Sequence, residues 1–353
     1  MQTRAIFVAA YRELSARKLF WLALAITLLV VGLFASLGIN EVGVSWFGWT
    51  GDSPYFNSGT MSPETFYKLL FVNFGVDWWL GLMATILALV TTCGIVPDLV
   101  APGSVDLLLA KPISRSRLFL TKYATGLMFA ALQVIVFSVA SFLAIGIRGG
   151  AWEWTLFLAV PIVTVTYSML FSICALVGMV TRSSIAALII TLMAWAAISA
   201  VTMGESLTRR GLLANTMDIA ACEAELADAD SPPDEDAREE LETRLTTRRE
   251  QRETWLSVHG WFNLVSTCLP KTGETLDALN RVIVDRGIGD NAEGDRRGPD
   301  GIFAPRMASR KEFNKAIEQD NASRSLTWIV GTSLIFEAVV LAIATMLFVR
   351  RDY

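Results

Sequence analysis

The sequence predicts an all-α polytopic membrane protein, a bundle of six transmembrane helices with a large helical insert between the fifth and the sixth. Apolar residues make up 53% of the 353 residues and charged residues only 18%, whereas a soluble domain carries about a quarter charged residues. Six apolar runs reach the roughly 20 residues that cross a hydrocarbon core of about 30 Å. Residues 205–325 hold 24 of the 34 acidic and 17 of the 30 basic side chains. A solvated insert is therefore joined to lipid-soluble helices.

The six predicted spans divide the chain into three parts. Residues 1–204 hold five spans, 205–325 the charged insert, and 326–353 the last span with a short tail. The first span has 21 residues, more than the about 7–15 of a signal-peptide core, so we expect an uncleaved anchor. Residues 1–18 are typical of a helix on the inner membrane surface or of an ordinary basic flank. The spans are 19–39, 78–96, 123–147, 154–180, 185–203 and 326–349.

Basic residues beside the spans predict the orientation, because cytoplasmic segments are enriched in Lys and Arg. With the N-terminus inside, the inner segments hold eleven basic residues and the short outer segments only Lys68 and Arg148. An even number of spans then leaves both termini in the cytoplasm and the insert outside. Long loops cross membranes largely regardless of charge. We therefore expect a multi-pass protein of the plasma membrane.

Local signals predict helices between the spans. In the outer loop 40–77, Ser62 is an N-cap, Pro63 the first helical residue and Glu64 an acid in the first turn. The segment 255–269 is too short and polar to span, and we interpret it as an interfacial helix. In the insert we expect helices at 205–229, 234–257, 272–287 and 311–325.

Few residues are suited to catalysis or metal binding. His259 is the single histidine, and no two of the four cysteines have CxxC spacing, so we expect no metal centre. Cys222 and Cys268 both lie in the insert and can pair if it faces an oxidising compartment. No phosphate-binding GxxxxGK[ST] loop occurs. We expect a protein that is not an enzyme, has no cofactor and, with a net charge of −4, does not bind nucleic acid.

The most informative segment is the inner loop between spans two and three, residues 97–123. Ser104 can cap a short helix whose apolar face includes Leu108 and Leu109. Pro112 ends that helix. A short helix of this kind is suited to docking on a partner protein, while its basic tail is equally suited to anionic lipid head groups. The residues alone leave both interpretations open.

The loop reads Gly103-Ser104, two further residues, three leucines, then Lys-Pro-Ile-Ser-Arg and a downstream lysine at 122. This pattern resembles the cytoplasmic loop of ABC-2 type transporter permeases, most closely the copper-enzyme-maturation type. The six-span layout and the Leu-Pro-Lys-Thr segment at 269–272 are also similar. Members of that group often carry an acid before the Gly-Ser/Thr pair, where this chain has Ala101-Pro102.

The resemblance implies a permease subunit of an exporter. It implies a separate cytoplasmic ABC ATPase as the energy source, and a second copy or a related permease as the other half. The residues that it implies for ATPase docking are Gly103, Ser104, Asp106, Leu108, Leu109, Lys111, Pro112 and Arg115.

Two other functions are compatible with the same fold. An ion-coupled secondary transporter places polar or ionisable residues within the membrane, and the candidates here are Glu337 in the sixth span and Gln133 in the third. A lone carboxylate is costly in lipid, so Glu337 either takes part in transport or is hydrogen-bonded to another helix. The second alternative is a non-transporting membrane protein that displays its insert outside. A membrane protease is excluded, since the spans contain no histidine and no HExxH motif.

Overall fold

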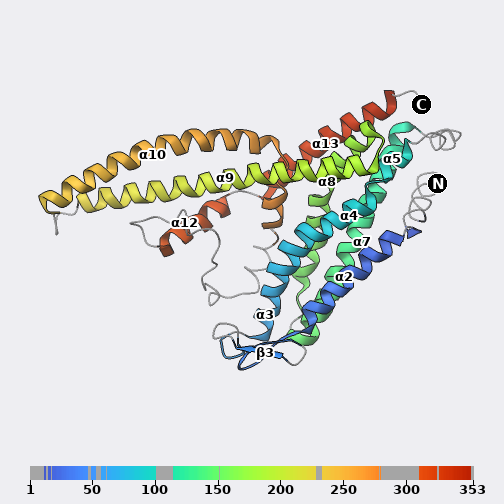
Figure 1. The fold of residues 1–353 in the computed structure, drawn as a ribbon, viewed down its shortest axis with the longest axis horizontal. Coiled ribbons are helices and arrows are strands. Elements are labelled where there is room, and N and C mark those ends of the chain that lie inside the picture. The colour runs from blue at the N-terminus through green and yellow to red at the C-terminus, as the bar shows by residue number, and fades with distance from the viewer. Residues whose placement is uncertain are drawn as a thin grey trace. The chain divides into compact units, whose positions relative to one another are not determined.

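Six helices of the computed structural model are long and apolar enough to cross a membrane (Figure 1). They comprise Lys18–Ser36, Pro63–Leu99, Arg115–Gly149, Trp154–Thr181, Ser184–Leu226 and Thr327–Arg350. The predicted all-α polytopic bundle is thereby confirmed. The structure describes residues 12, 15–16, 18–46, 49–52, 57–60, 62–100, 114–150, 152–227, 233–277, 279, 310–323 and 326–350.

The second span is composed of several helical pieces. It begins with α3 (Pro63–Leu70), continues as a π-helix and then as α4 (Thr85–Thr92), and ends with α5 (Ile95–Leu99). The predicted cap is confirmed, because the Ser62 side chain accepts a hydrogen bond from the Thr65 amide at 3.2 Å. The π-helix covers residues 71–84.

The remaining spans of the bundle are simpler. They are α2 (Lys18–Ser36), α7 (Arg115–Gly149) and α8 (Ala159–Thr181), the last preceded by a short 3₁₀ helix at residues 154–158. Pro161 lies in the first turn of α8, where a missing amide hydrogen costs no helical hydrogen bond. Gly126 of α7 lies so close to the Phe171 ring that a Cβ atom there would be 2.5 Å from it. Small residues of this kind let membrane helices approach closely.

The predicted end of the first span is wrong by three residues. The helix stops at Ser36, and residues 37–39 form the first strand of a three-stranded antiparallel sheet in the order β1-β2-β3. Leu37 pairs with Trp46, and Trp46 with Trp49. A short apolar run does not distinguish strand from helix by its composition, which explains the error. The strands are β1 (Leu37–Ile39), β2 (Gly43–Trp46) and β3 (Trp49–Asp52).

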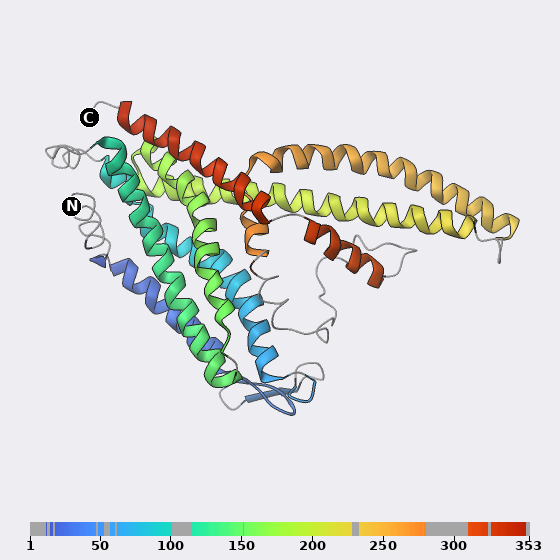
Figure 2. The same ribbon diagram turned by 180° about the vertical axis from the view of Figure 1, so that it is seen from behind.

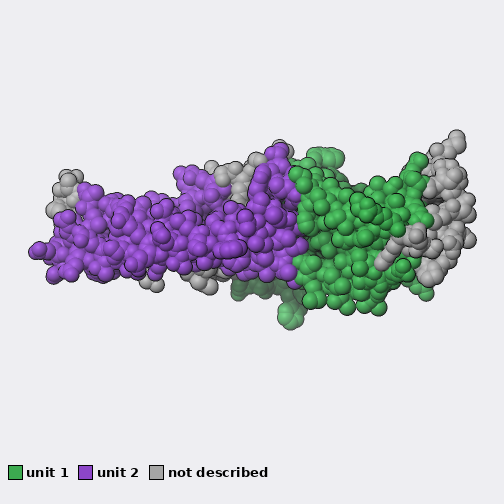
Figure 3. Space-filling model, turned by 90° about the horizontal axis from the view of Figure 1, so that it is seen from above, with its two compact units in different colours: residues 1–195, 272–292, 334–353 green, residues 196–271, 293–333 purple. Residues whose placement is uncertain are grey.

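The chain forms two compact units (Figure 3). The first contains residues 1–195, 272–292 and 334–353, and the second contains 196–271 and 293–333. Within the first unit, the apolar core consists of two clusters, and α7 contributes to both. One cluster includes Leu89 and Phe171, and the other includes Leu80 and Phe137.

The second unit contains a long helical hairpin. Helix α9 (Ser184–Leu226) continues without a break past Met203, where we expected the fifth span to end. Helix α10 (Glu235–Cys268) runs antiparallel beside it (Figures 1 and 2). The segments 205–229 and 255–269 are thus parts of longer helices rather than separate ones. A single glycine at 204 costs only about 1 kcal/mol within a helix, too little to end α9.

The two hairpin helices pack along one regular seam. Successive seam positions on α9 are four, three, seven and four residues apart, which fits the heptad pattern of helices packed side by side. Glycines face large aromatic rings, and polar residues face one another. Ordered along the seam, the pairs are Gly204 with Phe262, Thr208 with His259, Gly211 with Trp255, Asp218 with Arg248, and Cys222 with Leu245.

Two further helices follow the hairpin in the chain. They are α12 (Arg310–Ser323) and α13 (Leu326–Arg350), the sixth span. In the second unit, the Arg209 guanidinium of α9 pairs with the Asp320 carboxylate of α12 at 2.7 Å. This ion pair attaches α12 to the hairpin.

Candidate functional site

The predicted docking loop begins and ends in the apolar core. Leu99 and Val100, before the loop, and Leu118 and Phe119, after it, are all at most 2% exposed and belong to one cluster. The two ends of the loop are therefore held in one packed cluster of α5 and α7. Seven of the predicted docking residues, Gly103, Ser104, Asp106, Leu108, Leu109, Lys111 and Pro112, lie outside the described residues.

Arg115, the eighth predicted docking residue, is the first residue of α7. Its guanidinium Nη1 donates a hydrogen bond to the Val349 carbonyl oxygen at 3.3 Å, in the last turn of α13. The last carbonyls of a helix have no partner within it, and a cation is stabilised beside them. One turn further along α7, Phe119 packs on Phe348 with ring centroids 6.0 Å apart. The start of α7 is thus joined to the end of α13.

Glu337 joins three membrane helices. Its carboxylate is 7% exposed and accepts hydrogen bonds from the Tyr123 hydroxyl of α7 at 2.9 Å and the Ser168 hydroxyl of α8 at 2.7 Å. The Tyr123 oxygen also lies 2.8 Å from the Ser168 carbonyl, and the Ser168 hydroxyl 2.8 Å from the Val165 carbonyl. We call Tyr123, Ser168 and Glu337 the carboxylate node. Glu337 is thus hydrogen-bonded to two other membrane helices, and a role in transport stays a prediction.

Gln133 lies elsewhere on α7. Its amide nitrogen is 3.5 Å from the Thr27 hydroxyl of α2, and both side chains are buried. Ten residues separate Tyr123 from Gln133, about 15 Å along a helix. The two intramembrane candidates therefore do not form one site.

Sequence reasoning missed the partners of Glu337 and a second hydroxyl pair beside them. Tyr167 of α8 shares a hydrogen bond with Thr92 of α4, and both are buried. The rings of Tyr123, Phe171 and Tyr167 stack in succession with centroids 5.1 and 5.5 Å apart. Hydroxyl-bearing residues within apolar spans are the available signal, since such side chains often bond across membrane helices.

A second polar cluster lies where α3, α7 and β1 meet. The buried Lys68 ammonium pairs with Glu64 at 2.7 Å and with Glu153 at 3.0 Å. The Arg148 guanidinium and the Tyr67 hydroxyl both donate to the Leu37 carbonyl, at 3.2 and 2.6 Å. The spacing of four between Glu64 and Lys68 is the sequence signal for the first pair. Lys68 and Arg148, the basic residues of the segments predicted to lie outside, thus both form bonds within the protein.

The cysteines and the histidine form no site in the described part of the chain. All four cysteines are free thiols, so Cys222 and Cys268 do not pair. Cys222 packs beside Leu245, and Cys268 is 23 residues further along α10, about 35 Å, far beyond the reach of a disulfide. The described residues contain no group of three His, Cys, Asp or Glu side chains that could hold a metal ion. His259 lies 3.4 Å from the Thr208 hydroxyl in the hairpin seam.

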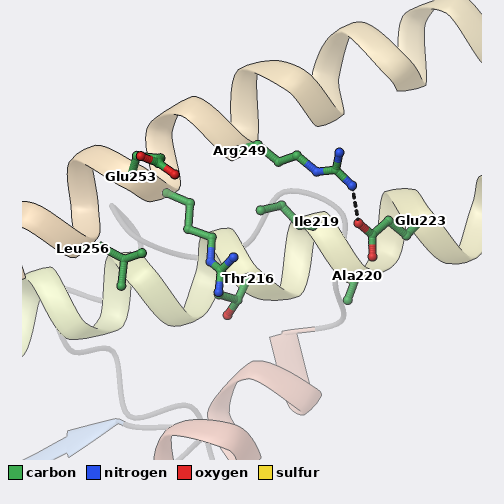
Figure 4. Close-up of a pocket in the computed structure, with 8 residues that line it drawn as sticks. Thr216, Ile219, Ala220, Glu223, Arg249, Glu253 and Leu256 are labelled. Carbon is green, nitrogen blue, oxygen red and sulfur yellow. Dashed lines mark hydrogen bonds and ion pairs between the residues drawn. The ribbon is translucent and has the colours of Figure 1, made fainter.

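A groove of about 450 Å³ lies on the hairpin surface between α9 and α10 (Figure 4). Glu223 and Arg249 point toward each other along its wall and form an ion pair of 2.9 Å. Thr216, Ile219 and Leu256 contribute to the lining. Among the lining residues, Thr216 carries a hydroxyl and the Glu223 carboxylate is paired with Arg249.

Comparison with known proteins gives one match. The model of the family described as ABC-2 family transporter protein matches residues 79–353, most of the chain. No curated protein and no solved structure matches. The matched region extends from the second span through the hairpin to the sixth span.

Proposed function

This chain belongs to the ABC-2 family of transporter proteins, and from that membership we propose that it forms one transmembrane half of an ATP-driven exporter. It is a multi-pass membrane protein and a transporter permease. The family match carries the proposal, and the resemblance to the copper-enzyme-maturation type is its finer form. A second copy or a related permease completes the pathway.

A separate ABC ATPase on the cytoplasmic side supplies the energy. The sequence contains no phosphate-binding loop of its own, and permeases of this family normally act without enzymatic activity. The ATPase docks on residues 103–115, between two helices whose ends lie in the apolar core. Movement of the docked subunit then passes through Arg115 to the end of α13, since its guanidinium bonds to the Val349 carbonyl.

The orientation follows from the same assignment. The docking loop and both termini face the cytoplasm, and residues 205–325 lie outside. The eleven basic residues of the inner segments support this orientation. The pairing of Lys68 with Glu64 and Glu153 and the internal bonds of Arg148 also support it, because neutralised or satisfied cations are less costly on the outer side.

Co-purification tests the ATPase partner. An ATP-binding subunit that co-purifies with the parent chain should be lost from a variant with Leu108→Asp and Leu109→Asp. The matched control is Val42→Asp, which changes an exposed apolar residue between β1 and β2. Absence of an ATP-binding partner from the parent and control chains under every condition contradicts the proposal.

Arg115 tests the transmission step. Arg115→Glu should lower ATP-dependent transport without preventing membrane insertion, because it removes a cation from the docking loop and places an anion beside the last carbonyls of α13. Arg115→Lys, which retains the charge, should lower transport less. Unchanged transport by Arg115→Glu rejects the role of this residue in coupling.

A further inference from the structure

Charge is divided sharply along α10. Residues 235–253 contain twelve acidic and basic side chains, whereas residues 254–268 contain none, His259 being their one titratable ring. The first part of α10 carries pairs such as Arg238 with Glu242 on an exposed surface. The second part lacks the charges of a water-facing helix but is not buried by the protein.

The uncharged part of α10 has two apolar faces. One includes Trp255, His259 and Phe262 and packs on α9 along the seam. The other is exposed: Trp261 is 71% and Leu264 66% exposed. At 100° per residue, this second face covers an arc of about 120° and points away from the seam. Its members are Val258, Trp261, Leu264, Val265 and Cys268.

The seam register gives the depth of the exposed face. In each seam pair the two residue numbers add to nearly the same value, 466 for Gly204 with Phe262 and for Asp218 with Arg248. Leu264 is therefore level with position 202 of α9 and Cys268 with position 198. The apolar run of the fifth span ends at Met203, and Glu205 is the next charged residue. Leu264 and Cys268 thus lie roughly 3 and 9 Å on the membrane side of this boundary.

The end of α10 is also held against the start of the sixth span. The Lys271 amide donates to the Ser333 hydroxyl at 3.0 Å, and the Lys271 ammonium lies 3.0 Å from the centre of the Trp328 ring. Both contacts lie within the second unit. The end of α10 is therefore held beside the first turns of α13.

We propose that residues 261–268 of α10 insert into the bilayer and contact lipid directly, so that they anchor the base of the hairpin. Trp261 lies at the head-group level, which tryptophan favours, and Leu264, Val265 and Cys268 lie among the acyl chains. Interfacial helices bury an apolar face about 5–10 Å deep, which agrees with the register. Lipid is the occupant because the exposed residues of α9 at the same level carry no charge and are small or apolar: Ala196, Ala197, Ser199, Ala200 and Met203. Which leaflet the face enters rests on the proposed orientation of the chain, whereas the contact with lipid does not.

Spin-label depth measurements on the full chain in phosphatidylcholine vesicles test the proposal. All labelled variants also carry Cys268→Ser, which removes the most exposed of the four thiols. The signal from labelling of the Cys268→Ser chain alone is subtracted from that of each variant. Nitroxides are placed on Leu264→Cys and Val265→Cys, and on Glu250→Cys as a water-facing control of the same helix. Labels at 264 and 265 should collide with lipid-soluble oxygen more than with a water-soluble nickel chelate, and the label at 250 should show the reverse.

Two outcomes overturn the proposal. Equal access of the nickel chelate to positions 264, 265 and 250 places the face in water. Protection of 264 and 265 from both reagents, together with crosslinking of Leu264→Cys between chains, makes a second copy the occupant. No variant replaces a tryptophan, so a folding defect from the loss of a packed ring does not obscure the result. Neither outcome depends on an ATPase partner, and the proposed function is tested separately.

Discussion

In the carboxylate node, we predict that removing the Glu337 carboxylate changes stability much less than removing the two hydroxyls that bond to it. In Glu337→Met the carboxylate disappears, yet both hydroxyls keep an acceptor, since Tyr123 lies 2.8 Å from the Ser168 carbonyl and Ser168 lies 2.8 Å from the Val165 carbonyl. No buried donor is left unpaired, and a buried carboxyl group is removed. We expect a change within about 1 kcal/mol of the parent free energy of unfolding.

The opposite change removes both donors. In the variant with Tyr123→Phe and Ser168→Ala, Glu337, which is 7% exposed in the parent, loses the hydroxyls that bond to it. Leaving a buried polar group without its hydrogen-bond partners costs about 1–3 kcal/mol. Tyr123→Phe retains the ring that stacks on Phe171 with an interplanar angle of 15°, so packing is largely preserved. Adding Glu337→Met to this variant should restore about 1 kcal/mol or more.

Reversible unfolding in a fixed mixture of mild and denaturing detergent measures these differences. The four proteins are the parent, Glu337→Met, the variant without donors, and the variant with all three substitutions. The reasoning is refuted if the variant without donors is as stable as Glu337→Met, or if the third substitution restores nothing. Either result would mean that water or a distant group satisfies the carboxylate.

Three further predictions concern the other polar and tightly packed positions. Gly211→Leu places a side chain against the Trp255 ring, which lies 3.0 Å from a Cβ atom built at this glycine. The substitution should destabilise the hairpin by about 1–3 kcal/mol, which faster proteolysis would reveal. Gly260→Ala is the control and should not destabilise the hairpin, because a Cβ atom there meets nothing within 4 Å. Lys68→Met leaves two carboxylates without their buried cation, so it should lower the free energy of unfolding by about 1–3 kcal/mol. Arg238→Ala breaks a pair whose side chains are 66% and 61% exposed. In the same unfolding assay it should lower the free energy of unfolding by less than about 1 kcal/mol. Gln133→Leu removes a single long bond of 3.5 Å and should change stability by about 0.6 kcal/mol or less; a larger loss contradicts a purely packing role.

Local patterns predicted the elements that depend on neighbouring residues. The six spans follow from apolar runs, because transfer into hydrocarbon adds up along a continuous stretch. The Ser62 cap followed from side-chain chemistry within four residues. The three-stranded sheet that begins at Leu37 was not predicted, because its strands are stabilised by pairing with one another rather than by local sequence. The continuity of α9 through Gly204 was missed because packing on Phe262 offsets the weak helix preference of glycine.

The candidate site divides in the same way. Its inner loop and the unusual carboxylate at Glu337 are visible in the sequence, since charge is rare inside a span. Whether that carboxylate faces a pathway or another helix depends on Tyr123, 214 residues away. The exposed face of α10 is also visible as an uncharged stretch, but its depth depends on the register with α9. Composition determines which segments leave water, whereas contacts between distant segments determine which side chains meet there.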